Sequence, residues 1–387
     1  MSDVVIIGVG QTPVGEHWDS SLRSLAARAI QAAREDAGHP KLDAMYIGNL
    51  LAPVVSSQSN LGALLAEYLG LEGIEALTVE AAEASGAGAF HQGYMAITSG
   101  FVDTVLVVGV EKCTDSIGAN LEAAATQSLD YDYETTQGLT PTSQAAMLMQ
   151  RYLHEYQVPR VALGEFPLLS HANAVANPNA MYRRAISYEV YERAAMLSNP
   201  LNIFDNASYA DGAAAVILTR ADRIPKPTPY PTIRVIGSSV VIDTLAVHDR
   251  PDLLAFKAAG LSVERACRQA GILPTDADLF ELSDNFSIYA ALTLEAAGFA
   301  HRGEGWKLAR EGKLSLNGEL PICTMGGAKG RGNPIGATGV YQIVEAVTQL
   351  RQRAGDNQVP DARRALVQSL GGPASTAITH VLEVVGN

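Results

Sequence analysis

Cysteine is scarce in this sequence, with three residues, Cys113, Cys267 and Cys323, in a chain of 387. They lie far apart and are odd in number, so they predict neither a disulfide framework nor a zinc site with Cys-x-x-Cys spacing. We therefore expect no metal site. Such sparing use of cysteine is typical of a reducing compartment, which indicates a cytoplasmic location.

Positive charge and long apolar runs are also in short supply. Lys and Arg number 28 against 41 Asp and Glu, which gives a net charge of −13 and an isoelectric point near 5.1. Nucleic acid or an anionic membrane would require a basic face, so both are disfavoured as partners. No window approaches the roughly 18 uninterrupted apolar residues of a membrane span, and no signal peptide is recognisable.

Aromatic residues make up only 6% of the chain, whereas 47% of it is hydrophobic and glycine is abundant, with 35 residues. This composition is typical of a globular protein in which helices pack closely on sheets. Up to residue 110, strand-like apolar runs alternate with segments of helical spacing, which predicts a mostly parallel sheet covered by helices. The expected strands are 4–10, 44–50, 77–79 and 104–110, and the expected helices are 21–37, 60–68 and 85–99.

The alternation stops near residue 111 and starts again near residue 232. Residues 111–206 contain helical pieces and polar loops, which is typical of a lid or binding module inserted into a domain. Four prolines within 225–231 mark the best internal boundary, so we expect two halves, 1–224 and 225–387. In the second half the expected strands are 232–242, 279–282, 364–369 and 377–385, and the expected helices are 253–270, 287–297 and 337–353.

A carboxylate occupies an unusual position at Glu83. A short strand ending at Val79 runs into small residues, and a helix is expected from Ser85, so the backbone must bend sharply near Glu83. The start of a helix leaves N–H groups unpaired and carries roughly half a positive charge. At such elbows enzymes expose a nucleophile beside amides that form an oxyanion hole. A plainer interpretation is that Glu83 stabilises the helix dipole by about 0.3–1 kcal/mol.

Three more segments place small or glycine residues after a strand. The first carries Ser283 and Asp284, which either belong to a site or only cap the following helix. The second, 325–339, is a glycine-rich run that would let a ligand approach the backbone, although it lacks the Gly-Lys-Ser/Thr ending of a phosphate loop. The third, 369–375, contains a glycine pair whose amides are candidates for an oxyanion hole.

Together these segments resemble the thiolases over essentially the whole chain, most closely the sterol-carrier-protein and archaeal-type thiolases. The resemblance implies an α/β fold of five layers, αβαβα, built from two similar halves with an inserted loop domain. It also implies a homodimer or a higher homo-oligomer, and several thiolase relatives act with a small zinc-ribbon and OB-fold partner protein. The matching stretches are Glu80–Gly86, Val107–Lys112, His171–Ala180, Ser208–Ala215, Gly326–Gly339 and Gly371-Gly372.

The reactive side chains of the family are changed in this sequence. The nucleophilic cysteine corresponds to Glu83, the histidine of the Gly-His-Pro motif to Asn333, the second cysteine to Ser369, and the His or Asn of the fourth catalytic loop to Ser283. The family's oxyanion hole corresponds to the amides of Glu83 and Gly371. Acylating a carboxylate would give an unstable mixed anhydride, and neither Asn333 nor Ser369 is a base near neutral pH. Ordinary thiolase activity is therefore not expected.

The resemblance leaves three functions open. The first is an acyl-CoA C–C lyase that performs retro-aldol cleavage of a β-hydroxyacyl-CoA, with Glu83 removing the hydroxyl proton. The second is a non-catalytic or scaffold subunit of a thiolase-like complex. The third is an acyltransferase that uses a relocated cysteine, Cys113 or Cys323.

The resemblance also implies where coenzyme A would bind. It enters as part of the acyl-CoA substrate, and no tightly bound cofactor is expected. In the family the inserted loop domain contacts the adenine and the phosphates. His171, Arg183 and Arg184 in the inserted segment are therefore the candidates for this contact.

Overall fold

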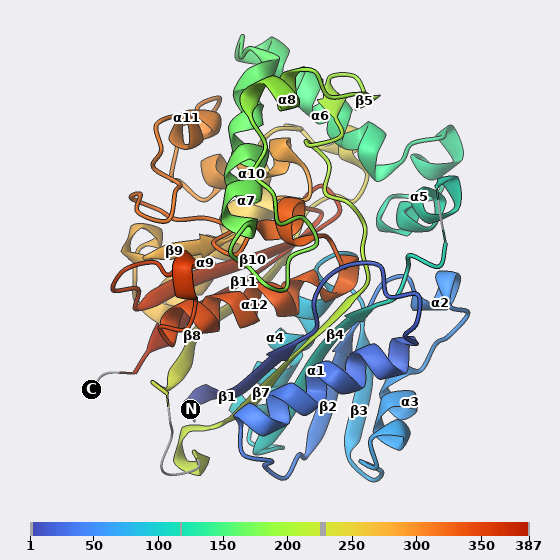
Figure 1. Ribbon diagram of the computed structural model, residues 1–387, viewed down its shortest axis with the longest axis vertical. Helices are drawn as coiled ribbons and strands as arrows, with labels where there is room; N and C mark the ends of the chain where they lie inside the picture. The colour runs from blue at the N-terminus through green and yellow to red at the C-terminus, as the bar shows by residue number, and fades with distance from the viewer. Residues whose placement is uncertain (1–2, 117, 225–229, 386–387) are drawn as a thin grey trace.

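The computed structural model describes residues 3–116, 118–224 and 230–385, and shows one continuous nine-stranded sheet and a separate two-stranded hairpin, β5-β6 (Figure 1). The order of the large sheet is β3-β2-β4-β7-β1-β8-β11-β10-β9. The strands are β1 (Val4–Gln11), β2 (Ala44–Gly48), β3 (Glu75–Val79), β4 (Thr104–Glu111), β5 (Met196–Ser198), β6 (Leu201–Asn202), β7 (Gly212–Arg220), β8 (Ile233–Ile242), β9 (Leu279–Glu281), β10 (Arg364–Gly371) and β11 (Thr376–Val384).

The strand order reveals two similar halves that meet at the β1–β8 pair. Reading outward from this junction, the first half runs β1-β7-β4-β2-β3 and the second runs β8-β11-β10-β9. In each half the first strand of the sequence lies at the junction and the last strand lies beside it. The prediction of an α/β fold with two halves of similar element order is therefore confirmed.

The helices complete five layers. Helices α1 and α3 cover the outer face of the first half, and α9 covers that of the second. Helices α4 and α12 contact strands of both halves and so lie between them (Figure 1). In the described residues no helix is long and apolar enough to cross a membrane. The helices are α1 (Leu22–Asp36), α2 (Ala52–Val55), α3 (Leu61–Tyr68), α4 (Ser85–Thr98), α5 (Ala119–Ala125), α6 (Pro141–Glu155), α7 (Glu165–Ala174), α8 (Tyr188–Glu192), α9 (Lys257–Ala270), α10 (Ser287–Ala296), α11 (Gly305–Arg310) and α12 (Thr338–Leu350).

The prediction of a mostly parallel sheet holds for the strands up to residue 110, because β1, β2, β3 and β4 run in the same direction, but it does not extend to the whole sheet. Three strand pairs are parallel and five are antiparallel. Parallel neighbours need a crossover of about a dozen residues or more, whereas antiparallel neighbours need only a tight turn. Only residues 372–375 separate β10 from β11, so these two strands must be antiparallel.

The packing of α1 on β1 illustrates how the sequence produces the layers. Ser21 caps α1 by accepting a hydrogen bond from the Ser24 amide, and the apolar face of the helix is buried. A Cβ at Gly8 would lie 2.3 Å from the Ala33 carbonyl oxygen, so β1 needs glycine there to lie this close to the helix.

The segment between β4 and β7 contains α5 to α8 and the β5-β6 hairpin, and forms the upper end of the molecule in Figure 1. Helix α6 begins at Pro141 because Thr140 and Ser143 form a capping box. Helix α7 was not predicted, since its buried face includes the polar residues His171 and Asn173. The predicted boundary within 225–231 falls largely on residues 225–229, outside the described part of the chain.

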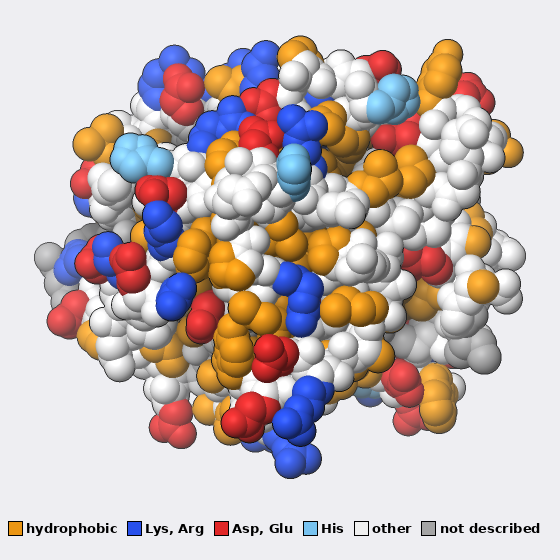
Figure 2. Space-filling view, turned by 90° about the horizontal axis from the view of Figure 1, so that it is seen from above, with side chains coloured by type: hydrophobic (Ala, Val, Ile, Leu, Met, Phe, Trp, Pro, Cys, Tyr) orange, Lys and Arg blue, Asp and Glu red, His pale blue; other side chains and the backbone are white. Residues whose placement is uncertain are grey.

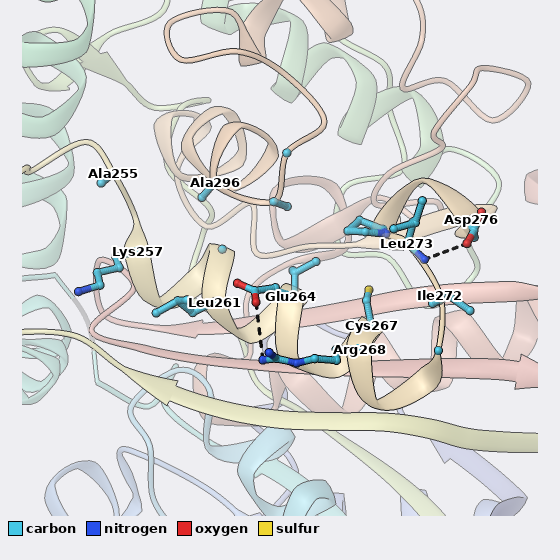
Figure 3. A pocket seen from close by; sticks show the side chains of 16 residues that line it. Ala255, Lys257, Leu261, Glu264, Cys267, Arg268, Ile272, Leu273, Asp276 and Ala296 are labelled. Atoms are coloured by element: carbon cyan, nitrogen blue, oxygen red, sulfur yellow. Dashed lines mark hydrogen bonds and ion pairs between the residues drawn. The ribbon is translucent and has the colours of Figure 1, made fainter.

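An open groove of about 950 Å³ runs along α9 (Figure 3). Leu261 and Cys267 from the helix and Leu273 from the following loop line it, and the side chain of Leu273 is 66% exposed. None of the predicted site residues lines this groove.

Candidate active site

Glu83 lies in a tight elbow between β3 and α4. The residue before it, Ala82, has a φ of +52°, in the left-handed region that non-glycine residues rarely adopt. The Ser85 hydroxyl donates to the Ala82 carbonyl at 2.6 Å and accepts from the Ala81 amide at 2.9 Å. The Ala84 amide also donates to the Ala81 carbonyl, so the elbow is held by its own hydrogen bonds.

The half-buried carboxylate of Glu83 binds the glycine turn. Its Oε2 accepts a hydrogen bond from the Gly372 amide at 2.7 Å. Burial raises the pKa of Glu83, while the amides of Gly372 and of Glu83 itself and the Ser128 hydroxyl oppose the rise. The carboxylate thus binds the same kind of donor that would stabilise an oxyanion.

The two glycines of the turn, Gly371 and Gly372, make different contacts with the elbow. The amide on the Glu83 carboxylate belongs to Gly372, whereas Gly371 ends β10 and packs on the elbow. A Cβ at Gly371 would lie 2.5 Å from the Ala81 carbonyl oxygen, so only glycine allows the elbow and the turn to approach this closely.

Ser283 and Ser369 are both buried and bonded within the protein. The Ser283 hydroxyl donates to the Gln368 carbonyl at 3.4 Å and accepts from the Leu370 amide at 3.0 Å. The Ser369 hydroxyl donates to Gln342 Oε1 at 2.6 Å. These bonds position β10, from which the glycine turn extends.

The alternative interpretation of Ser283 and Asp284 as helix caps is wrong. Helix α10 starts at Ser287 with Phe286 as its N-cap residue and has no side-chain cap bond. Asp284 is buried and instead accepts hydrogen bonds from the Ser170 hydroxyl at 3.0 Å and the Ala328 amide at 2.6 Å. It therefore links the inserted segment to the glycine-rich run.

Asn333 is buried, with its amide group held in one orientation. Its Oδ1 accepts from the Ile335 amide at 3.1 Å and from the Thr338 hydroxyl at 3.0 Å. This leaves its NH₂ group as a donor, for which the described residues supply no acceptor. The backbone of Asn333 forms a bridge with Tyr209.

Sequence reasoning missed two tyrosines at the site, Tyr209 and Tyr289. Burial raises the pKa of both phenols, and the negative charge of Glu83 adds to the rise in each. Tyr209 lies within the matching stretch Ser208–Ala215, which could have pointed to it, whereas Tyr289 belongs to no motif and reaches the site through the packing of α10.

The glycines of 325–339 with the shortest contacts face the backbone of neighbouring elements. A Cβ at Gly336 would lie 2.7 Å from the Leu50 amide nitrogen, and one at Gly339 would lie 2.5 Å from that of Ala87. At these positions the expectation that glycine serves close approach of a ligand is wrong. The backbone of a neighbouring element takes that place.

The two cations of the glycine-rich run are internal. They lie on a π-helical turn, Gly327–Arg331, and both are buried. Lys329 Nζ donates to the carbonyls of Phe204 at 3.2 Å and Asp205 at 2.6 Å, and burial lowers its pKa to about 8. Arg331 pairs with Glu345 at 2.5 Å. Both cations therefore hold elements together.

The cysteines near the motifs are buried thiols. Cys113 Sγ donates to the Ala210 carbonyl at 3.5 Å, and Cys323 Sγ donates to the Leu282 carbonyl at 3.7 Å. Burial raises the pKa of both thiols, which favours the unreactive neutral form.

The three candidate residues for coenzyme A differ in exposure and charge. His171 is buried beside the rings of Tyr182 and Phe204, and burial lowers its pKa, so the ring is neutral near pH 7. Arg183 and Arg184 are exposed, and Arg183 Nε donates to the Val175 carbonyl at 3.4 Å. Only the two arginines therefore offer positive charge to solvent.

Comparison with known proteins identifies the family. Residues 4–195 match the thiolase N-terminal domain, and residues 239–384 match the thiolase C-terminal domain-like family. An acetyl-CoA acetyltransferase of Methanothermobacter thermautotrophicus is 39% identical over 98% of this chain and 99% of its own. The chain belongs to the thiolase superfamily.

Thiolase-superfamily relatives with other names are also similar. A 17-hydroxy-3-oxo-4-pregnene-20-carboxyl-CoA lyase of Mycobacterium tuberculosis is 28% identical over 89% of this chain and 91% of its own. The solved structure of the Ltp2-ChsH2(DUF35) aldolase superposes with a TM-score of 0.86 and 25% identity, over 99% of this chain and 98% of that one. The superfamily to which this chain belongs thus includes proteins named as acyltransferases and as lyases.

Proposed function

We propose that this chain is an acyl-CoA C–C lyase that cleaves β-hydroxyacyl-CoA by a retro-aldol reaction, with Glu83 as the general base. The observation that carries the proposal is a carboxylate of raised pKa at the elbow, bonded to the Gly372 amide. A carboxyl whose pKa is shifted toward neutrality is a better base than an ordinary one. The relatives named as a lyase and an aldolase support this reaction class.

The proposed reaction moves one proton from the substrate and returns it. Glu83 accepts the β-hydroxyl proton as the Cα–Cβ bond breaks, which yields an aldehyde or ketone and a thioester enolate. Once neutral, Glu83 is a weaker acceptor, and the amides of Gly372 and Glu83 become available to the enolate oxygen. The NH₂ group of Asn333 is a further donor. Protonated Glu83 then returns its proton to the α-carbon, which closes the balance.

Acyl transfer is the less favoured chemistry for this chain. It needs an accessible thiolate, whereas Cys113 and Cys323 are buried thiols of raised pKa. The similarity to acetyl-CoA acetyltransferases keeps the acyltransferase as the alternative.

Coenzyme A would enter as part of the substrate and leave with the product. The exposed Arg183 and Arg184 are the candidates for contact with its phosphates. The buried, neutral ring of His171 would support the inserted segment by packing.

A small zinc-ribbon and OB-fold protein is the proposed partner. The Ltp2-ChsH2(DUF35) aldolase is named as a pair of proteins, which supports a partner for a chain of this fold. Figure 2 views this chain from above, where apolar side chains lie among mixed charges. Exposed apolar residues of the inserted segment include Met147, Val190, Met196 and Leu197. If the chain is instead a scaffold, the partner should still bind and no cleavage should occur.

We expect Glu83→Gln to abolish cleavage while the fold is kept. Loss of the base should lower kcat by about 10²–10³-fold, measured as aldehyde release from β-hydroxyhexanoyl-CoA. Glu80→Gln is the matched control, because the exposed Glu80 lies in the same elbow and accepts from the Ala82 amide. Equal rates in wild type and Glu83→Gln would remove the catalytic role. Acetyl transfer from acetoacetyl-CoA by wild type would support the acyltransferase.

A further inference from the structure

Arg250 is a buried cation without an ion pair. Three arginines of the described residues are less than a tenth exposed, namely Arg250, Arg331 and Arg351. Arg331 pairs with Glu345 and Arg351 pairs with Asp36, both at 2.5 Å. Within the described chain no carboxylate lies within ion-pair distance of Arg250. A buried charge is costly unless an opposite charge or hydrogen bonds compensate it.

The hydrogen bonds of Arg250 leave one nitrogen free. Its Nε donates to the Thr244 carbonyl at 2.9 Å, and its Nη1 donates to the Pro373 carbonyl at 2.6 Å. Its Nη2 is buried and has no acceptor among the described residues. Two carbonyls thus fix the guanidinium plane, and a third donor position remains for a ligand. A guanidinium donor pairs most strongly with a carboxylate or phosphate.

Arg250 lies next to the proposed catalytic site. Pro373, which accepts from its Nη1, directly follows Gly372, and the Gly372 amide binds Glu83. The charges of both residues act on Tyr289, because that of Glu83 raises its pKa while that of Arg250 lowers it. Glu134 and Asp243 are the nearby acidic groups, and both act on Arg250 only at a distance.

We infer that Arg250 binds a carboxylate carried by the acyl group of the substrate, so that the preferred substrates are CoA thioesters of dicarboxylic acids. The inference rests on the proposed function for the reaction and adds the substrate class. The pantetheine arm separates the phosphates of coenzyme A from the thioester. An anion held beside Glu83 therefore belongs to the acyl group. Arg250 would also offset the repulsion between this carboxylate and Glu83.

The binding test compares adipyl-CoA with hexanoyl-CoA, which differ by a terminal carboxylate and contain no β-hydroxyl group. Calorimetry should show wild type binding adipyl-CoA at least about tenfold more tightly, as expected for a charge-assisted hydrogen bond. Arg250→Gln should bring the ratio close to one; the ratio is the readout, because Arg250 also holds the Pro373 carbonyl and its loss affects both ligands. Arg250→Lys, which keeps the charge, should give an intermediate ratio. Arg302→Gln is the control, because the exposed Arg302 pairs with Asp252 in the same loop.

Wild type that binds both thioesters equally, or an adipyl-CoA preference that survives in Arg250→Gln, would overturn the inference. Cleavage of β-hydroxyadipyl-CoA separates it from the proposed function. If the binding ratio depends on Arg250 but no cleavage occurs, the lyase proposal fails and the Arg250 site stands. If both β-hydroxyadipyl-CoA and β-hydroxyhexanoyl-CoA are cleaved with equal kcat/KM, the lyase stands and the Arg250 site fails.

Discussion

At the scale of single residues, the Glu83 carboxylate would have two roles, as a base and as a hydrogen-bond acceptor. As a base it must accept a proton from the substrate, yet it already accepts a hydrogen bond from the Gly372 amide. The proposed reaction reconciles the two, because protonation weakens this bond at the moment when an oxyanion forms. Glu83 therefore acts first as the base, and the amide that it releases then donates to the oxyanion at the same position.

The raised pKa of Glu83 predicts how pH affects stability. A carboxyl with a higher pKa in the folded state than in the unfolded state stabilises the fold below its unfolded pKa. That contribution is lost as pH rises through the folded pKa. Glu83→Gln removes the ionisation, so its Tm should exceed that of wild type by an amount that grows as pH rises from about 4.5 through the raised pKa of Glu83. Calorimetric scans across this range check the trend.

Glu80→Gln is again the control, since Glu80 is exposed in the same elbow, and its Tm difference from wild type should stay flat over that range. A Glu83→Gln difference that shrinks with rising pH would mean that ionised Glu83 stabilises the fold through its bond to Gly372.

The sequence was sufficient to single out Glu83, because a strand, small residues and a helix start predict a sharp bend that presents its side chain. It was not sufficient for Arg250 or Tyr289. These residues lie in a loop and on a helix far along the chain, and only tertiary packing brings them to the elbow.

At the scale of elements, glycine sets the distance between α12 and the elbow helix α4. Gly339 is in the first turn of α12, where an alanine would by itself favour the helix by roughly 1 kcal/mol. A Cβ there would instead lie 2.5 Å from the Ala87 amide nitrogen and 2.8 Å from Ser369 Oγ. The glycine therefore allows α12 and α4 to approach each other more closely than a larger residue would.

We predict that Gly339→Ala destabilises the protein despite the better helix propensity of alanine. Overpacking of this kind costs about 1–3 kcal/mol, to be measured by chemical denaturation. Gly15→Ala is the matched control, because a Cβ at Gly15 would meet no atom within 4 Å. A stabilised Gly339→Ala protein would show that α12 can move away from α4 at little cost.

The same contacts explain which element predictions failed. Hydrophobic periodicity located α1, β4 and β10, because these elements bury apolar faces. Periodicity cannot tell whether a glycine run faces a ligand or another backbone, and the run at 325–339 faces backbone at its tightest points. It also carries no information on strand direction, so it did not predict that β7 runs antiparallel to its neighbours β1 and β4.

At the scale of the whole molecule, one edge strand of the large sheet is a candidate for contact with another chain. This strand is β3, whose only hydrogen-bonded neighbour in the described part of the chain is β2. Leu77 on this strand is 53% exposed, and Met95 on α4 is 48% exposed. An exposed strand edge with apolar side chains invites pairing with another chain. We propose that two copies pair antiparallel through β3 in a two-fold homodimer.

Leu77→Lys should therefore dissociate the dimer, because it places charge in the centre of the proposed interface. Sedimentation velocity on dilute protein is expected to show dimer for wild type and mostly monomer for the variant. Leu273→Lys is the matched control, since Leu273 is 66% exposed but lies in the groove along α9 (Figure 3), and α9 and β3 lie on opposite sides of the molecule (Figure 1). Dissociation by Leu273→Lys alone would move the interface to that groove, and a wild-type monomer would remove the homodimer altogether. Glu83 lies only a few residues after the end of β3. Loss of the dimer should therefore also loosen the elbow that carries Glu83 and lower the rate of cleavage in Leu77→Lys.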